Sequence, residues 1–93
     1  MNVRYSARAL ADLDRLFDFI ASHDPFAATH AAERISEAVP LLRNHPYIGR
    51  AVRGELRELV ISHGRYGYVA LYRVRGNDVV VLALRHQREA GFQ

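Results

Sequence analysis

The hydrophobic period changes once along this chain, and that change constrains the fold more than any other feature. In the first segment the apolar residues recur at the spacing of one helix face: Leu10, Leu13, Leu16, Phe17 and Ile20. A second helical stripe follows: Ala28, Ala31, Ile35, Ala38, Val39 and Leu42. From Leu56 onward the apolar residues alternate as they do in strands. The pattern predicts two amphipathic helices, over residues 7–22 and through about residue 43, followed by strands.

The ends of these helices carry their own signals. Val3–Tyr5 has the residues of a short strand, and Ser6 follows it as a candidate N-cap. Asp24 is placed to cap the second helix, with Pro25 in the first turn, where a missing N–H costs nothing. Pro40 is expected to kink this helix or to separate its last turn.

Three strands are predicted in the second half, at residues 56–62, 66–75 and 78–85. Turns at residues 63–65 and at Gly76-Asn77 join them, so they form an antiparallel meander. In the middle strand Tyr66, Tyr68 and Tyr72 are expected on one face, and Val69 and Leu71 on the other. The predicted order is β-α-α-β-β-β, a single α+β domain over residues 1–93 in which two helices cover one face of a small sheet.

The three aspartates of the first helix, Asp12, Asp14 and Asp18, fall outside its apolar stripe. We therefore expect them on the solvent-facing side.

Several classes of protein are disfavoured by residues that are missing. The chain has no cysteine, and its longest wholly apolar run, residues 79–84, is too short to cross a membrane. The first residues contain no apolar core of a signal peptide, so we expect a cytoplasmic protein that does not bind membranes. No two of the five histidines have metal-ligand spacing, and no glycine-rich phosphate loop or nucleophile elbow is present. We therefore expect no metal, no cofactor and no small-molecule enzyme.

Arginine is distributed unevenly. All thirteen basic side chains are arginine, which a GC-rich genome would explain. From Arg50 onward, however, eight arginines stand against four acids, with tyrosines between them. Such a basic sheet half suits binding of nucleic acid or of an acidic peptide. An ordinary solvated sheet face, with cross-strand pairs such as Glu58 with a neighbouring arginine, explains the pattern equally well.

Phe19 and Phe26 flank the turn between the helices and lie off both apolar stripes. They form either an exposed patch that docks a partner or, with Pro25, a staple that holds the turn.

An ordered set of short motifs spans nearly the whole chain. It consists of Tyr5-Ser6-x-x-Ala9 leading to Asp12-Leu13, Asp24-Pro25, Pro46-x-x-Gly49-Arg50, Leu56-Arg57-Glu58-Leu59, Tyr68-x-x-x-Tyr72-Arg73 and Val81-Leu82-Ala83-Leu84-Arg85-His86-Gln87-Arg88. This set resembles the RelE/ParE toxins of bacterial type II toxin–antitoxin modules. The resemblance implies two helices on a mainly antiparallel sheet. It also implies a hetero-oligomer with a cognate, ParD-like antitoxin whose disordered or helical segment wraps the toxin.

The family has two mechanistic branches. RelE-like members cleave mRNA on the ribosome, and ParE-like members inhibit DNA gyrase without a nuclease site. At positions where RelE has basic residues this chain has Glu58, Val60 and Val69, and its counterpart of a C-terminal tyrosine is Phe92. The resemblance therefore favours a non-enzymatic gyrase inhibitor of the ParE branch. The alternatives are a ribosome-dependent endoribonuclease and a non-toxic family member that only binds its partner.

Two sets of site residues follow from the basic half and the two phenylalanines. The residues expected to face the target are Arg57, Arg65, Arg85, His86 and Arg88, of which Arg85, His86 and Arg88 would be catalytic in a nuclease. Those expected to bind the antitoxin are Phe19, Phe26, Arg73 and Arg75. For Arg57 and Arg85 a structural role, through nearby acids or the chain ends, is an open alternative, and Tyr72 is expected to pack rather than to act.

Overall fold

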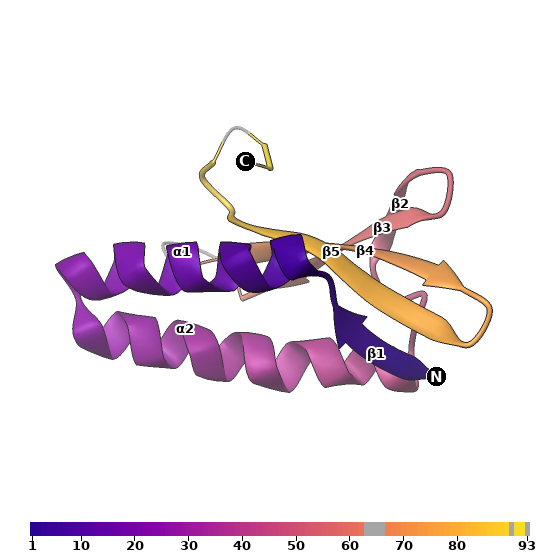
Figure 1. Ribbon diagram of the computed structural model, residues 1–93, viewed down its shortest axis with the longest axis horizontal. Helices are drawn as coiled ribbons and strands as arrows, with labels where there is room; N and C mark the ends of the chain where they lie inside the picture. The colour runs from indigo at the N-terminus through magenta and orange to yellow at the C-terminus, as the bar shows by residue number, and fades with distance from the viewer. Residues whose placement is uncertain (63–66, 90, 93) are drawn as a thin grey trace.

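The computed structural model describes residues 1–62, 67–89 and 91–92, and it has two helices packed on one five-stranded sheet (Figure 1). In chain order its elements are β1 (Asn2–Tyr5), α1 (Ala7–His23), α2 (Pro25–Ala38), the short 3₁₀ helix η1 (Val39–Arg43), β2 (Arg50–Arg53), β3 (Leu56–Ile61), β4 (Tyr68–Arg75) and β5 (Asp78–His86). The predicted fold class is confirmed. The predicted turn at residues 63–65, Arg65 included, and Tyr66 lie outside the described residues.

The helix ends are where the sequence predicts them, because local hydrogen bonds fix them. The Ser6 hydroxyl accepts the N–H of Ala9 at 3.0 Å and caps α1. The Asp24 carboxylate accepts the N–H groups of Phe26 and Ala27 at 3.1 and 3.2 Å and caps α2. Helix α2 ends two residues before Pro40, and η1 forms the separated last turn.

The strand order is β1-β5-β4-β3-β2, with β1 parallel to β5 and the other pairs antiparallel. The sequence-based order lacked β2. All four residues of this edge strand are exposed, so it shows none of the alternation that identifies a half-buried strand. The hairpin at Gly76-Asn77 is confirmed, and Gly76 has the positive φ of 58° that such a turn requires. No helix in the described part of the chain is long and apolar enough to cross a membrane.

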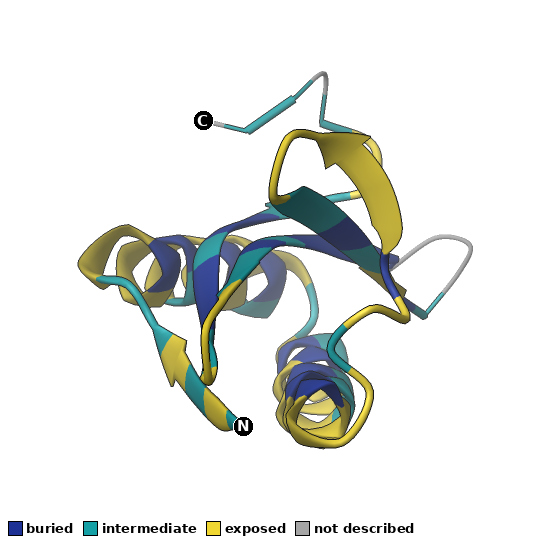
Figure 2. Ribbon diagram, turned by 90° about the vertical axis from the view of Figure 1, so that its right-hand side faces the viewer, coloured by how far each residue is buried: buried dark blue, intermediate teal, exposed yellow. Residues whose placement is uncertain are grey.

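The core lies between the helices and the sheet (Figure 2). Its fully buried side chains include Tyr68, Tyr72, Leu42, Leu84, Val39, Val79 and Val81. The predicted stripe of α2 is confirmed, but that of α1 is partly wrong. Leu10 and Phe17 are 52% and 43% exposed, whereas Asp12 is buried with Ala9, Leu16 and Ile20. Helix α1 is thus rotated toward the face that carries Asp12, which bonds to β5 beneath it.

Tyr72 holds the loop that leads into β2. Its ring is fully buried, and its hydroxyl accepts the N–H of Gly49 at 2.9 Å. Arg57 donates to the carbonyls of Tyr47 and Gly49 at 3.2 and 2.8 Å, so both ends of this short segment are fixed. Burial raises the pKa of the Tyr72 hydroxyl, and the Gly49 hydrogen bond and the Arg57 charge oppose that rise. The expectation that Tyr72 packs agrees with this position.

The raised pKa of Tyr72 predicts weaker folding at alkaline pH. Above the ordinary pKa of 10.0 the unfolded hydroxyl ionises before the folded one, so the free energy of unfolding falls as the pH rises further. Tyr72→Phe should flatten that fall and, because the Gly49 N–H loses its acceptor, cost about 1 kcal/mol at pH 7. Urea unfolding at pH 7 and above pH 10 measures both effects. An unchanged pH dependence in Tyr72→Phe would contradict the assignment.

Candidate functional site

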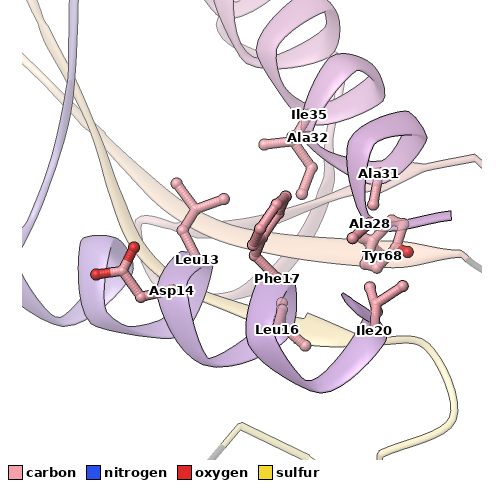
Figure 3. A pocket seen from close by; sticks show the side chains of 10 residues that line it. All are labelled: Leu13, Asp14, Leu16, Phe17, Ile20, Ala28, Ala31, Ala32, Ile35 and Tyr68. Atoms are coloured by element: carbon pink, nitrogen blue, oxygen red, sulfur yellow. The ribbon is translucent and has the colours of Figure 1, made fainter. Parts of the chain in front are cut away.

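A groove runs between the two helices (Figure 3). Its volume is about 240 Å³, and nine of its ten lining residues are not charged. They come from α1, α2 and β4: Leu13, Asp14, Leu16, Phe17, Ile20, Ala28, Ala31, Ala32, Ile35 and Tyr68.

The groove exists because α2 presents small side chains to large ones on α1. Ala32 stands beside Phe17, and Ala28 and Ala31 lie near Ile20 and Tyr68, so the space that larger residues would fill stays open (Figure 3). Phe17 is 43% exposed here although it belongs to an apolar stripe. Such a groove suits the apolar side chains of an amphipathic helix.

The second feature is the edge of β5 beyond the end of β1. Strand β1 pairs with β5 only as far as Tyr5 opposite Val81. From there side chains replace the neighbouring strand: the Ser6 hydroxyl donates to the Leu82 carbonyl at 3.1 Å, and the Asp12 carboxylate accepts the Leu84 N–H at 2.9 Å. The Leu82 carbonyl and the Leu84 N–H therefore have partners, although no strand of the described residues lies beside them.

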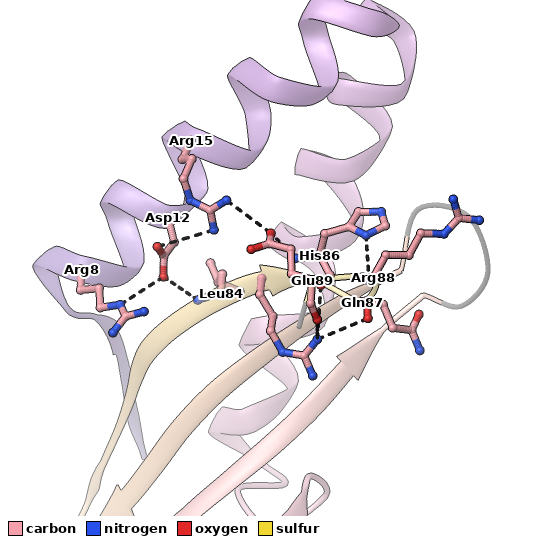
Figure 4. A network of polar contacts seen from close by, with 9 residues as sticks. Arg8, Asp12, Arg15, Leu84, His86, Gln87, Arg88 and Glu89 are labelled. Atoms are coloured by element: carbon pink, nitrogen blue, oxygen red, sulfur yellow. Dashed lines mark hydrogen bonds and ion pairs between the residues drawn. The ribbon is translucent and has the colours of Figure 1, made fainter. Parts of the chain in front are cut away.

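Asp12 begins a polar network that ties α1 to the C-terminal turn (Figure 4). Arg8 and Arg15 lie 3.7 and 3.9 Å from its carboxylate, and Arg15 also lies 3.3 Å from Glu89. Glu89 in turn accepts the N–H of His86 at 3.0 Å. The prediction that Asp12 faces solvent was wrong. Its spacing from Ala9 and Leu16, three and four residues, places it on their face of the helix, and that spacing is the signal that could have found it.

The C-terminal turn folds around Arg85. One guanidinium nitrogen of Arg85 donates to the carbonyls of His86, Gln87 and Glu89 at 3.2 to 3.3 Å. The guanidinium also lies over the Phe92 ring, 5.1 Å from its centre. Beside it the His86 Nδ1 accepts the N–H of Arg88 at 3.0 Å, while the Arg88 side chain is exposed (Figure 4).

The sheet face that points away from the helical core brings together the positions at which this chain departs from the nuclease pattern. Val60, Val69 and Arg85 are direct neighbours across β3, β4 and β5. On the same face Glu58 is 8% exposed and forms a cross-strand ion pair of 2.7 Å with Arg50. Phe92 lies against Arg85 from the C-terminal end. This surface thus carries Arg85, the paired side chains of Arg50 and Glu58, Arg73 opposite Leu56, and apolar groups.

Comparison with known proteins assigns the family. Residues 3–91 match the ParE toxins of type II toxin–antitoxin systems, parDE, which is nearly the whole chain. The chain belongs to the ParE toxin family. It is 35% identical over 88 residues to Toxin RelE3 of Caulobacter vibrioides and 37% identical over 84 residues to Toxin RelE2 of the same organism. These alignments cover 95% and 90% of this chain and 96% and 92% of the relatives.

The fold of this ParE-family toxin also matches solved structures. A chain of the chromosomal ParDE system from P. aeruginosa superposes with a TM-score of 0.79 at 27% identity, and the match covers 92% of this chain and 95% of that one. A conserved hypothetical protein from Helicobacter pylori shares the fold alone, with a TM-score of 0.59 at 16% identity.

The residues expected to face the target of the toxin do not form one cluster. Arg85, His86 and Arg88 lie together at the C-terminal turn. Arg57 lies apart from them, on the core side of β3, where it binds the loop carbonyls. Arg57 and Arg85 both donate hydrogen bonds to backbone carbonyls, and such contacts agree with the alternative that their role is structural. Within the described residues no group of three acidic or histidine side chains is placed to hold a metal ion.

The residues expected to bind the antitoxin lie at opposite ends of the molecule. Phe19 and Phe26, 64% and 87% exposed, stand at the turn between α1 and α2. Arg73 and Arg75 are near the β4–β5 hairpin at the other end of the 40 Å long axis (Figure 1). Arg75 pairs with Glu55 at 3.3 Å, and the buried Nε of Arg73 has no hydrogen-bond partner among the described residues. The sequence interpretation assigned the groove residues Leu13 and Phe17 to the core, because they recur at the spacing of one helix face.

Proposed function

We propose that this toxin inhibits DNA gyrase without cleaving nucleic acid, and that a cognate antitoxin silences it. The observation that carries the proposal is the composition of the sheet face around Arg85. RNA cleavage through the ribose 2′-OH requires a group that accepts a proton, one that donates a proton, and cations that stabilise the phosphate.

The side chains on this face are poorly suited to that chemistry. Val60, Val69 and Phe92 cannot transfer a proton. Glu58 is buried against Arg50. One guanidinium nitrogen of Arg85 already donates hydrogen bonds to three backbone carbonyls of the chain itself. A surface of this kind instead suits contact with another protein, since it combines apolar side chains with arginine.

The test is a cleavage assay with purified gyrase, supercoiled plasmid and ATP. We expect the toxin to increase the amount of plasmid that is linearised after denaturation of gyrase, and the antitoxin to suppress that increase. Gyrase that supercoils and cleaves DNA equally with and without the toxin would contradict the proposal.

The alternative of a ribosome-dependent ribonuclease has one observation in its favour. His86 and Arg88 remain next to each other at the C-terminal turn, and Arg88 is exposed. This alternative requires new cuts in translated mRNA after expression of the toxin, and their loss in His86→Ala or Arg88→Ala. We expect growth arrest with intact mRNA. If expression of the chain without antitoxin does not arrest growth, the chain would instead be a non-toxic binding module.

The groove between α1 and α2 supports the antitoxin part of the proposal. Its lining is apolar apart from Asp14, and the partly exposed Phe17 forms one side. An antitoxin segment that folds into an amphipathic helix on binding would bury these side chains. Such a helix would run along the pair toward Phe19 and Phe26 at its end.

Phe19→Ala is expected to weaken antitoxin binding about threefold to tenfold while changing the free energy of unfolding by less than about 0.5 kcal/mol. The reason is exposure: Phe19 is 64% accessible, and its ring lies against that of His23 at 5.0 Å between centres. Phe26, 87% exposed, buries too little surface to staple the turn. Calorimetric titration with the antitoxin and urea unfolding measure the two quantities. Unchanged affinity with lost stability would restore the staple interpretation.

A further inference from the structure

Strand β2 is a free sheet edge. It pairs with β3 on one side, and all four of its residues, Arg50–Arg53, are exposed (Figure 2). The opposite edge differs, because η1 packs beside β1 and the N-terminal amine donates to the Arg43 carbonyl at 3.4 Å. A free edge presents unpaired N–H and C=O groups to any extended chain that approaches.

The surface beside this edge is apolar. Tyr47, Ile48 and Val52 are 64%, 49% and 49% exposed and lie within six residues of one another. Single exposed apolar side chains are ordinary, but a cluster next to a free edge invites aggregation unless a partner covers it. Arg57 and Tyr72 fix the loop that carries Tyr47 and Ile48, so the surface is preformed.

Besides these apolar side chains, the surface at the free edge carries positive charge. Residues 44–54 contain Arg50 and Arg53 and no acidic residue. Glu58 neutralises Arg50 in part, although the Arg50 side chain stays 74% exposed. Arg53 is exposed and forms no ion pair within the described part of the chain. The occupant that this charge favours is acidic.

We propose that an extended, acidic segment of the antitoxin binds here by adding a strand to the free edge of β2. Main-chain hydrogen bonds to β2 supply affinity, and alternate side chains supply specificity. Its carboxylates pair with Arg53 and with the exposed part of Arg50, and its apolar residues cover Ile48 and Val52. The inference rests on the proposed antitoxin partnership and is independent of whether gyrase is the target. It also gives the antitoxin a second contact, apart from the groove.

The test compares two variants of the whole toxin for binding to its cognate antitoxin. Val52→Glu combined with Arg53→Glu places two negative charges on the free edge, and we expect it to weaken binding at least tenfold. Arg4→Glu is the matched control, because Arg4 is also an exposed arginine on an edge strand, β1. It should change affinity less than twofold. Both variants are first checked for native unfolding midpoints.

Hydrogen exchange of wild-type toxin provides a second measurement that no variant can disturb. We expect amides of residues 50–53 to exchange at least tenfold more slowly in the complex than in the free toxin. Equal exchange in both states, or equal affinity of the double variant and wild type, overturns the edge site. If the double variant binds the antitoxin more weakly and residues 50–53 exchange more slowly in the complex, the edge site is supported. A lack of any effect on gyrase would then contradict only the proposed target.

Discussion

Replacing Phe17 with aspartate is expected to weaken antitoxin binding roughly 30-fold or more, which corresponds to a loss of about 2 kcal/mol or more. Phe17 stands in the groove between α1 and α2, where Ala32 and Ile35 face it. A carboxylate there would leave an apolar contact unmade and would be desolvated by the bound helix. It would also lie one helical turn from Asp14, the one charged group of the lining. Calorimetric titration of the variant with the antitoxin measures the effect.

Leu10→Asp is the matched control for this variant. Leu10 lies on the same helix and is 52% exposed, but it does not line the groove. Its replacement by aspartate introduces the same charge as Phe17→Asp. We expect it to bind the antitoxin within about twofold of the wild type. If both aspartates weaken binding equally, the effect is one of helix charge, and the groove is not the docking site.

Asp12→Ala is expected to lower the free energy of unfolding by about 1–3 kcal/mol. The change removes the acceptor of the Leu84 N–H, which no neighbouring strand replaces at that point of β5. It also leaves Arg8 and Arg15 without their shared carboxylate. Urea unfolding at pH 7 measures the loss.

Two further variants isolate the cause of this loss. Asp12→Asn keeps an oxygen that accepts the Leu84 N–H and should recover most of the stability. Asp14→Ala removes an exposed acid from the same helix and should change stability by less than about 0.5 kcal/mol. If Asp12→Asn is as destabilising as Asp12→Ala, the charge matters more than the hydrogen bond to Leu84.

The sequence predicted those parts of the fold that local chemistry determines. Ser6, Asp24 and Pro40 mark helix ends because caps and a missing N–H act within a few residues. The hairpin at Gly76-Asn77 follows from the backbone angles that glycine allows. These features need no information from the rest of the chain.

The features that sequence reasoning missed depend on what lies beside each element. Strand β2 forms because β3 offers it hydrogen bonds. All its side chains are exposed, so its sequence lacks the alternation of apolar and polar residues that would identify a strand. Leu10, Asp12 and Phe17 were assigned by hydrophobicity alone. The buried face of α1 depends also on the N–H of Leu84, which pairs with the Asp12 carboxylate and makes an acid more favourable than leucine at that core-facing position. The groove follows from the same rotation, since it leaves Phe17 at the rim.

The side chains that complete the edge of β5 have a consequence for when the chain can fold. Strand β1 pairs only with β5, and Ser6, Asp12 and Arg15 find their partners 72 to 76 residues further along. The amino-terminal half therefore lacks its supporting neighbours until β5 has been synthesised. Because contacts of such long separation form late and slowly, we expect β1 and α1 of a nascent chain to stay unfolded until β5 has left the ribosome. An antitoxin present at that moment would meet the two helices as they fold onto the sheet.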